Sequence, residues 1–116
     1  MCMVDSSGIV LQYMVKKESV TKDKIMKDMN KISNMLANKG IYSAIDFKYY
    51  NNKIISDTIT DNLWYFISSD IIIKHNPEAE YEITDYGIKI SNYLLKNFKE
   101  NETAWNIYNE ILDALS

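Results

Sequence analysis

Arginine is absent from this chain of 116 residues, and all thirteen of its basic side chains are lysines. The guanidinium fork of arginine is the group that binds guanine or phosphate through two parallel hydrogen bonds. A protein without it has to hold a phosphate through the single ammonium group of lysine. Any recognition of nucleic acid by this chain would therefore depend on lysine together with neutral polar side chains.

Residues that build catalytic and metal sites are also scarce. The chain has one cysteine, Cys2, which lies at the start where chain ends fray, and one histidine, His75, which we place in a hairpin turn. We therefore expect neither a Cys/His pair for catalysis nor a zinc ligand set within one chain. Its glycines, Gly8, Gly40 and Gly87, lie too far apart to form a phosphate-binding loop. We expect no enzyme activity, no metal site and no cofactor.

Long apolar runs are missing as well. No stretch approaches the roughly 18 to 20 apolar residues that a membrane span requires, and the first eight residues contain Asp5 but no basic residue, unlike a signal peptide. The length suits one hydrophobic core, and the 47% apolar and 25% charged fractions are close to globular averages. We expect a single cytoplasmic domain covering residues 1–116, without membrane contact.

Charge is distributed unevenly along the chain. Residues 16–53 contain nine lysines and four acidic residues, a net charge of +5, whereas residues 54–116 contain four lysines and eleven acidic residues, a net charge of −7. An anionic partner would therefore meet the first half of the protein.

Apolar residues recur at helical spacing in five segments. We assign helices to residues 8–17, capped by Ser6 or Ser7, and 22–38, capped by Thr21, and further helices to residues 57–69, 86–98 and 102–115. A short strand is expected near Ala44 to Phe47, followed by a turn at Asn51 and Asn52. Two strand-like runs, 71–74 and 80–84, are joined by residues 75–79, where Pro77 favours a turn; this hairpin would place His75 in the turn.

Two helix faces are candidates for function. Lys24, Lys27 and Lys31 follow one stripe of the second helix with Asn34 and Asn38, which is either a solvated face or an edge that follows phosphates. The outer face of the third helix is expected to hold the acidic and aromatic residues Asp57, Asp61, Trp64, Tyr65 and Ser68.

The order of these elements resembles a winged helix-turn-helix domain over roughly Gly8 to Phe98. The most specific part is Tyr81-Glu-Ile-Thr84-x-x-Gly87, which resembles the "Y-x-(L/I)-T-x-x-G" that leaves the wing in small prokaryotic and archaeal members. Independently of the resemblance, the Thr84 hydroxyl can accept a hydrogen bond from a first-turn amide, and Gly87 allows the helix to start close to the sheet.

A second stretch, "FKYYNNKIISDTITDNLWYFISSDIII", is similar to a subgroup with a "G-P-x-S" turn before the third helix and "G-L-I" after it. This chain has Lys53 and Ile54 in place of the Gly-Pro pair and Asp70 in place of the later glycine. The resemblance implies an α+β, mainly helical fold, a winged helix-turn-helix core at about 8–98 with an extra C-terminal helix at about 102–115.

The family resemblance implies a DNA-binding transcriptional regulator that acts by occupying an operator in double-stranded DNA. The third helix would enter the major groove and the wing would touch the flanking backbone. The acidic residues of both elements would repel phosphates, so lysines would have to hold the backbone. The candidate DNA-binding residues are Lys24, Lys27, Lys31, Lys48, Lys53, Thr58, Asn62 and Tyr65.

Two other functions remain open. The domain could bind another protein through Trp64, Tyr65 and the acidic wing, because aromatic side chains are enriched where interface energy is concentrated. A nucleic-acid-processing enzyme is a weaker third interpretation. The last helix carries an apolar stripe that either closes the protein's own core or pairs with a second copy, and we expect a homodimer through Trp105, Tyr108, Leu112 and Leu115.

Overall fold

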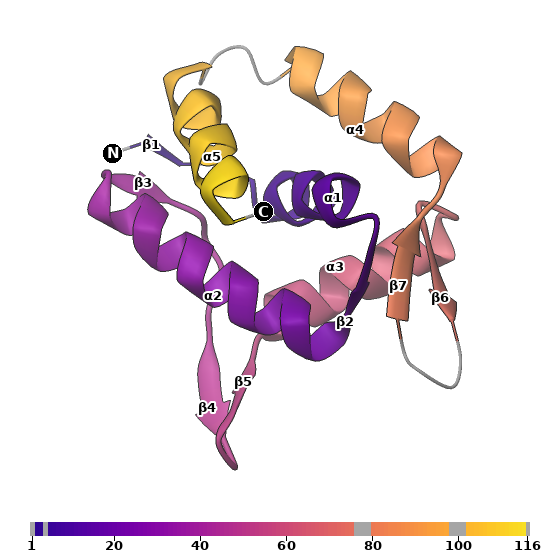
Figure 1. Cartoon of the computed structure of the whole chain (residues 1–116), viewed down its shortest axis with the longest axis horizontal. Helices are drawn as coiled ribbons and strands as arrows, with labels where there is room; N and C mark the ends of the chain where they lie inside the picture. The colour runs from indigo at the N-terminus through magenta and orange to yellow at the C-terminus, as the bar shows by residue number, and fades with distance from the viewer. Residues whose placement is uncertain (1, 4, 76–79, 98–101, 116) are drawn as a thin grey trace.

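The computed structural model describes residues 2–3, 5–75, 80–97 and 102–115 and shows an α+β fold that is mainly helical (Figure 1). None of the helices in these ranges is long and apolar enough to cross a membrane. The elements are β1 (Cys2–Met3), α1 (Ser6–Lys17), β2 (Ser19–Thr21), α2 (Lys22–Asn38), β3 (Ile41–Tyr42), β4 (Lys48–Tyr50), β5 (Lys53–Ile55), α3 (Asp57–Ser68), β6 (Ile72–His75), β7 (Glu80–Ile83), α4 (Asp85–Asn97) and α5 (Glu102–Leu115).

Side-chain caps begin two of the helices. The Thr21 hydroxyl accepts the Lys24 N–H of α2 at 3.3 Å, and the Ser56 hydroxyl accepts the Ile59 N–H of α3 at 3.2 Å. The cap expected for the first helix is wrong, because α1 follows Asp5 and has no side-chain cap bond.

The main sheet has three antiparallel strands in the order β2–β7–β6. Val20 of β2 and Lys74 of β6 both lie opposite Tyr81 of β7. The expected hairpin is confirmed for β6 and β7, but its placement of His75 in the turn is wrong: His75 is the last residue of β6 and pairs in register with Glu80. Pro77, on which the turn was based, lies outside the described residues.

A second, two-stranded hairpin connects α2 to α3. The turn expected at Asn51 and Asn52 is confirmed, and both residues have positive φ, 49° and 63°. The strand expected at Ala44 to Phe47 is wrong, because these residues form no strand, and β4 starts only at Lys48. Ala44 has a φ of 58°, outside the extended region, and this interrupts the apparent alternation of the sequence.

The core is built around α1, which is buried on most of its circumference and packs against α3 and α4. The expected apolar stripe of α2 is confirmed, with Ile25, Met29, Ile32 and Leu36 all fully buried. An amphipathic helix gains most of its stability from burying such a face.

Helix α5 closes this core. Trp105, Tyr108 and Leu112 are buried within the chain, Leu115 is half-buried, and the Tyr108 hydroxyl donates a hydrogen bond to the carbonyl oxygen of Ile9 in α1. Of the two alternatives that the sequence left open for this apolar stripe, packing in the protein's own core is the one that the structure of the single chain shows. Trp105, Tyr108 and Leu112 are thus covered by their own chain, and a homodimer through this stripe stays a prediction.

The start of α4 is fixed against β6 by Thr84 and Gly87. The Thr84 hydroxyl accepts the Gly87 N–H at 2.9 Å and lies 2.7 Å from the carbonyl oxygen of Asp70, to which it donates. Gly87 is buried, and a Cβ at this position would collide with the carbonyl group of Ile71. Both roles proposed for these residues from the sequence are confirmed.

Candidate nucleic-acid interface

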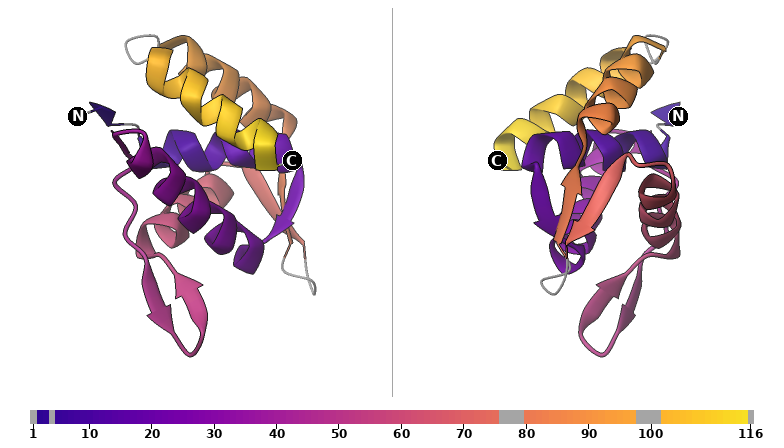
Figure 2. Two further views of the ribbon diagram at one scale, coloured as in Figure 1. Left: turned by 60° about the vertical axis from the view of Figure 1, so that its left-hand side comes forward. Right: turned by 90° about the vertical axis from the view of Figure 1, so that its right-hand side faces the viewer.

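Two hairpins project from the same side of the molecule. In Figures 1 and 2 the β4–β5 and β6–β7 hairpins both point downward, with the N-terminal end of α2 between them. We call this the hairpin side. The lysines that the structure brings together on it come from segments far apart in the sequence.

One pocket lies between α2 and the tip of the β4–β5 hairpin. It has a volume of about 290 Å³ and is lined by Asp23, Lys27, Asn51, Asn52, Lys53 and Ile54. Two of the lysines proposed from the sequence, Lys27 and Lys53, are therefore neighbours in space. Neither has an ion-pair partner among the residues that the structure describes.

A second pocket lies between α3, the start of α2 and the main sheet. It has a volume of about 210 Å³ and is lined by Lys22, Thr60, Leu63, Trp64, Ile67, Lys74 and Tyr81. Lys22 and Lys74 were not identified from the sequence. Lys22 is off the stripe of Lys24, and Lys74 belongs to the acidic half of the chain, so no local pattern marks either as part of a basic site.

The lysine stripe of α2 is exposed as expected, but its members differ in their partners. Lys24 lies 3.1 Å from Asp28 Oδ1, and the other oxygen of Asp28 accepts a hydrogen bond from the Tyr13 hydroxyl. Burial, reinforced by the hydrogen bond and the negative charge of Asp28, raises the pKa of Tyr13 far above its ordinary value. Lys24 is thus tied to the core, while Lys27 and Lys31 extend into solvent.

The outer face of α3 is acidic and aromatic, as the sequence predicts. Asp57, Asp61, Trp64, Tyr65 and Ser68 are all exposed, and Trp64 and Tyr65 expose 68% and 65% of their surface.

The acidic start of α3 is close to a lysine of the hairpin. Lys48 Nζ lies 3.1 Å from Asp57 Oδ2, which brings a β4 lysine to the first turn of α3. Because both side chains are well exposed, this pair adds little stability, but it offsets part of the negative charge of the helix.

The three uncharged residues of α3 that are candidates for DNA binding differ in their exposure to solvent. Tyr65 is exposed and its ring packs edge-to-face with that of Phe66, whereas Thr58 and Asn62 are half-buried. The Asn62 Nδ2 atom is itself buried and has no hydrogen-bond partner within the described residues. Tyr65 is therefore the most accessible of the three for contact with a ligand.

Within residues 5–75, 80–94 and 102–115, no three His, Cys, Asp or Glu side chains are grouped as a metal site would require. Comparisons with protein-family models, curated proteins and solved structures find no match to this chain.

Proposed function

We propose that this protein binds double-stranded DNA as a winged helix-turn-helix domain and regulates transcription by occupying an operator. Strand β2, between the first two helices, completes a sheet with the β6–β7 hairpin, and this supports the winged-helix interpretation. In this interpretation α3 is the recognition helix and β6–β7 is the wing.

The observation that carries the proposal is the placement of four lysines in two pockets on the hairpin side, one of which is lined by α3. Lys27 and Lys53 line the pocket beside the β4–β5 hairpin, and Lys22 and Lys74 line the pocket beside the main sheet. None of the four is paired with an acidic residue in the described part of the chain. Each lysine that neutralises a DNA phosphate releases a condensed counterion, which favours binding.

In the proposed mechanism, different residues contact the DNA backbone and the DNA bases. The lysines hold phosphates on either side of α3, and Tyr65, Thr58 and Asn62 are the neutral groups available to base edges. Pairing of Asp57 with Lys48 reduces the repulsion between the start of α3 and the DNA backbone.

Salt-dependent binding to a short DNA duplex tests the proposal. With four lysines on phosphates, the logarithm of the binding constant should fall against the logarithm of salt concentration with a slope of about −4. A variant with Lys22→Gln, Lys27→Gln and Lys74→Gln should bind more than tenfold more weakly at low salt, with a slope reduced by about three. Lys24 is left unchanged because it is paired with Asp28.

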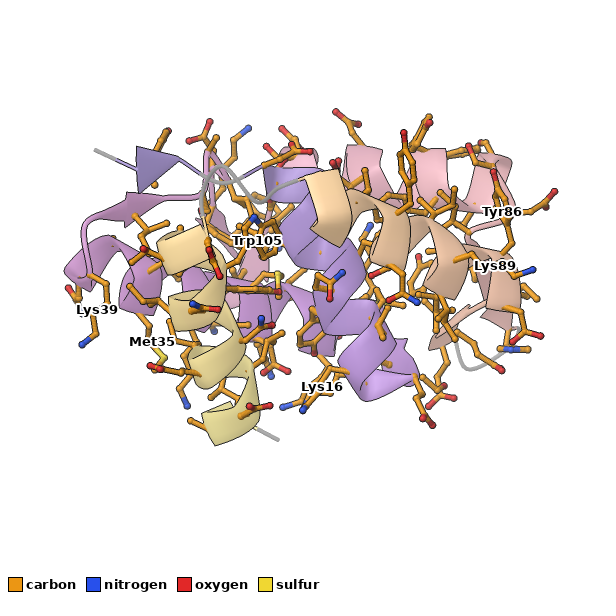
Figure 3. The ribbon with its side chains drawn as sticks, turned by 90° about the horizontal axis from the view of Figure 1, so that it is seen from above. Lys16, Met35, Lys39, Tyr86, Lys89 and Trp105 are labelled. Atoms are coloured by element: carbon orange, nitrogen blue, oxygen red, sulfur yellow. The ribbon has the colours of Figure 1, made fainter. Side chains whose placement is uncertain are left out.

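The matched control neutralises lysines away from the hairpin side. Figure 3 views the molecule from the opposite side, where Lys39 at the end of α2 and Lys89 on α4 are labelled. Lys39→Gln together with Lys89→Gln should leave affinity and slope unchanged. The control removes two charges and the triple variant three, so an equal loss per lysine in the two would mean that binding depends on overall charge, and the proposed interface would be rejected.

Protein recognition is the second candidate function, and one observation favours it: the exposure of the adjacent Trp64 and Tyr65 on α3. Large exposed aromatic side chains are typical anchors of protein interfaces. If the wild-type protein shows no retention on duplex DNA even at low salt, the DNA-binding proposal fails and this alternative replaces it.

A further inference from the structure

The β4–β5 hairpin is short and sharply defined. Tyr50 lies opposite Lys53 across a two-residue turn, and the positive φ of Asn51 and Asn52 is the combination that a type I′ turn requires. This turn matches the twist of the flanking strands, so the hairpin has a fixed register and presents its side chains in fixed directions.

Burial does not explain the residues that the hairpin carries. Tyr49 and Tyr50 expose 73% and 67% of their surface, and all residues from Lys48 to Lys53 are exposed. A two-stranded hairpin is marginally stable by itself, and two large side chains left in water add little hydrophobic stabilisation. The aromatic rings are therefore available to a partner.

The two tyrosines point to opposite faces, because side chains alternate along a strand. On one face, the Tyr49 hydroxyl accepts a hydrogen bond from Asn30 Nδ2 of α2 at 3.3 Å, which ties the hairpin to the domain. On the other face Tyr50 lies opposite Lys53 and next to Lys48 on its own strand. Tyr50 has no hydrogen bond or ring contact within the described residues.

The hairpin is also basic, unlike its neighbour on the hairpin side. Residues 48–55 contain Lys48 and Lys53 and no acidic residue, whereas β6 and β7 contain Glu80 and Glu82 beside Lys74. In the β6–β7 hairpin, Glu82 also pairs with the ring of His75 at 2.8 Å. Of the two projections on this side, the β4–β5 hairpin is therefore the more complementary to an anionic surface.

We propose that the β4–β5 hairpin is a second DNA-contacting arm, in which Lys53 binds a phosphate and Tyr50 and the Asn51–Asn52 tip reach the minor groove beside the segment bound by α3. The inference rests on the proposed function and extends it. A helix in the major groove leaves a minor groove on its flank, and asparagine and lysine are side chains that bind there. The narrow, strongly negative minor groove of A·T-rich DNA should be preferred at this flank.

The test compares the wild-type protein with a Tyr50→Ala, Lys53→Gln double variant on duplexes whose flanks are A·T-rich or G·C-rich. The variant should bind A·T-flanked DNA about tenfold more weakly, lose the preference between flanks, and show a salt slope smaller by about one. Hydroxyl-radical footprinting should show loss of protection at one flank, with the central protection retained. A single Tyr50→Phe variant, which keeps the aromatic ring and leaves Lys53 in place, should bind A·T-flanked DNA with most of the wild-type affinity.

The control is a Tyr93→Ala, Lys89→Gln double variant on α4, which removes the same groups from an exposed helix away from the hairpin side. It should behave as the wild type. The inference is overturned if the hairpin variant keeps the wild-type affinity, slope and footprint while the Lys22, Lys27 and Lys74 variant loses binding; the proposed function would then rest on those three lysines without Lys53. Absence of DNA binding by the wild type would reject both.

Discussion

Gly87 at the start of α4 lies directly against the backbone carbonyl of Ile71, which precedes β6. A Cβ at position 87 would overlap that carbonyl oxygen and would stand 2.8 Å from Ile83 Cγ1. The carbonyl cannot move away cheaply, because it accepts the Thr84 N–H and lies within hydrogen-bond distance of the Thr84 hydroxyl, both at 3.0 Å. The helix therefore starts at this distance from the sheet only with glycine.

Replacing this glycine should destabilise the fold. We expect Gly87→Ala to lower the free energy of unfolding by about 1 to 3 kcal/mol, the usual cost of inserting atoms into a packed site. Urea denaturation followed by circular dichroism measures this loss.

The control for this variant is Gly40→Asn. Gly40 has a φ of 78° and open space around the position of a Cβ, and asparagine tolerates this backbone conformation, so the change should stay within about 0.5 kcal/mol. A Gly87→Ala protein as stable as the wild type would show that α4 can shift away from the sheet.

Local patterns in the sequence were sufficient for the helices and for the tight turns. The stripe from Ile25 to Leu36 defines the buried face of α2, and the Asn51–Asn52 pair marks a turn because both residues tolerate positive φ. These features depend on neighbours within a few residues. The role of Thr84 at the start of α4 was predictable for the same reason.

Features that depend on distant segments were missed. Strand β2 has three residues, and its partner β7 lies about sixty positions later, so no local periodicity marks it. Lys22 and Lys74 share a pocket only because α2 and β6 pack beside α3. The stripe of α5 could not be assigned either, since burial in the same chain and burial in a dimer require the same apolar pattern.

Removing the Tyr13 hydroxyl should weaken the contact between α1 and α2. Tyr13→Phe removes the hydrogen bond to Asp28, which pairs with Lys24 on its other oxygen. A hydrogen bond to a charged group contributes about 1.5 to 3 kcal/mol, so we expect a loss of unfolding free energy in this range at neutral pH. Tyr93→Phe on the exposed face of α4 is the control and should be neutral.

The same variant has a defined pH dependence. The raised pKa of Tyr13 means that the folded protein keeps this proton while the unfolded chain loses it near the ordinary value of 10.0. The stabilisation is therefore fully present below pH 10 and decreases as the pH rises further. The difference in unfolding free energy between wild type and Tyr13→Phe should shrink above that pH, and a constant difference up to the alkaline limit would contradict the proposed role of the hydroxyl.

Neutralising an acid on α3 should strengthen DNA binding. Asp57→Asn removes a carboxylate near the proposed DNA backbone and releases Lys48, its partner at 3.1 Å. We expect affinity for duplex DNA at low salt to rise severalfold, whereas stability falls by about 0.3 to 1 kcal/mol because an acid is lost from the first turn of α3. Fluorescence anisotropy measures the affinity, with Glu110→Gln on α5 as the control. Weaker binding by Asp57→Asn would mean that this carboxylate contacts the DNA itself.

The packing of α5 leads to a prediction that distinguishes burial of its apolar stripe within one chain from burial between two copies. Leu112 is 5% exposed and lies in the same cluster as Tyr108, whose hydroxyl reaches Ile9. Truncation of a buried leucine leaves a cavity, so Leu112→Ala should cost about 2 to 5 kcal/mol of unfolding free energy. Because the contact is within one chain, the loss should be the same at every protein concentration, and sedimentation should show an unchanged oligomeric state. Exposed Asn109→Ala on the same helix is the control. If the loss depends on protein concentration, or if the variant dissociates, the stripe of α5 lies between two copies and the packing described for it is incorrect.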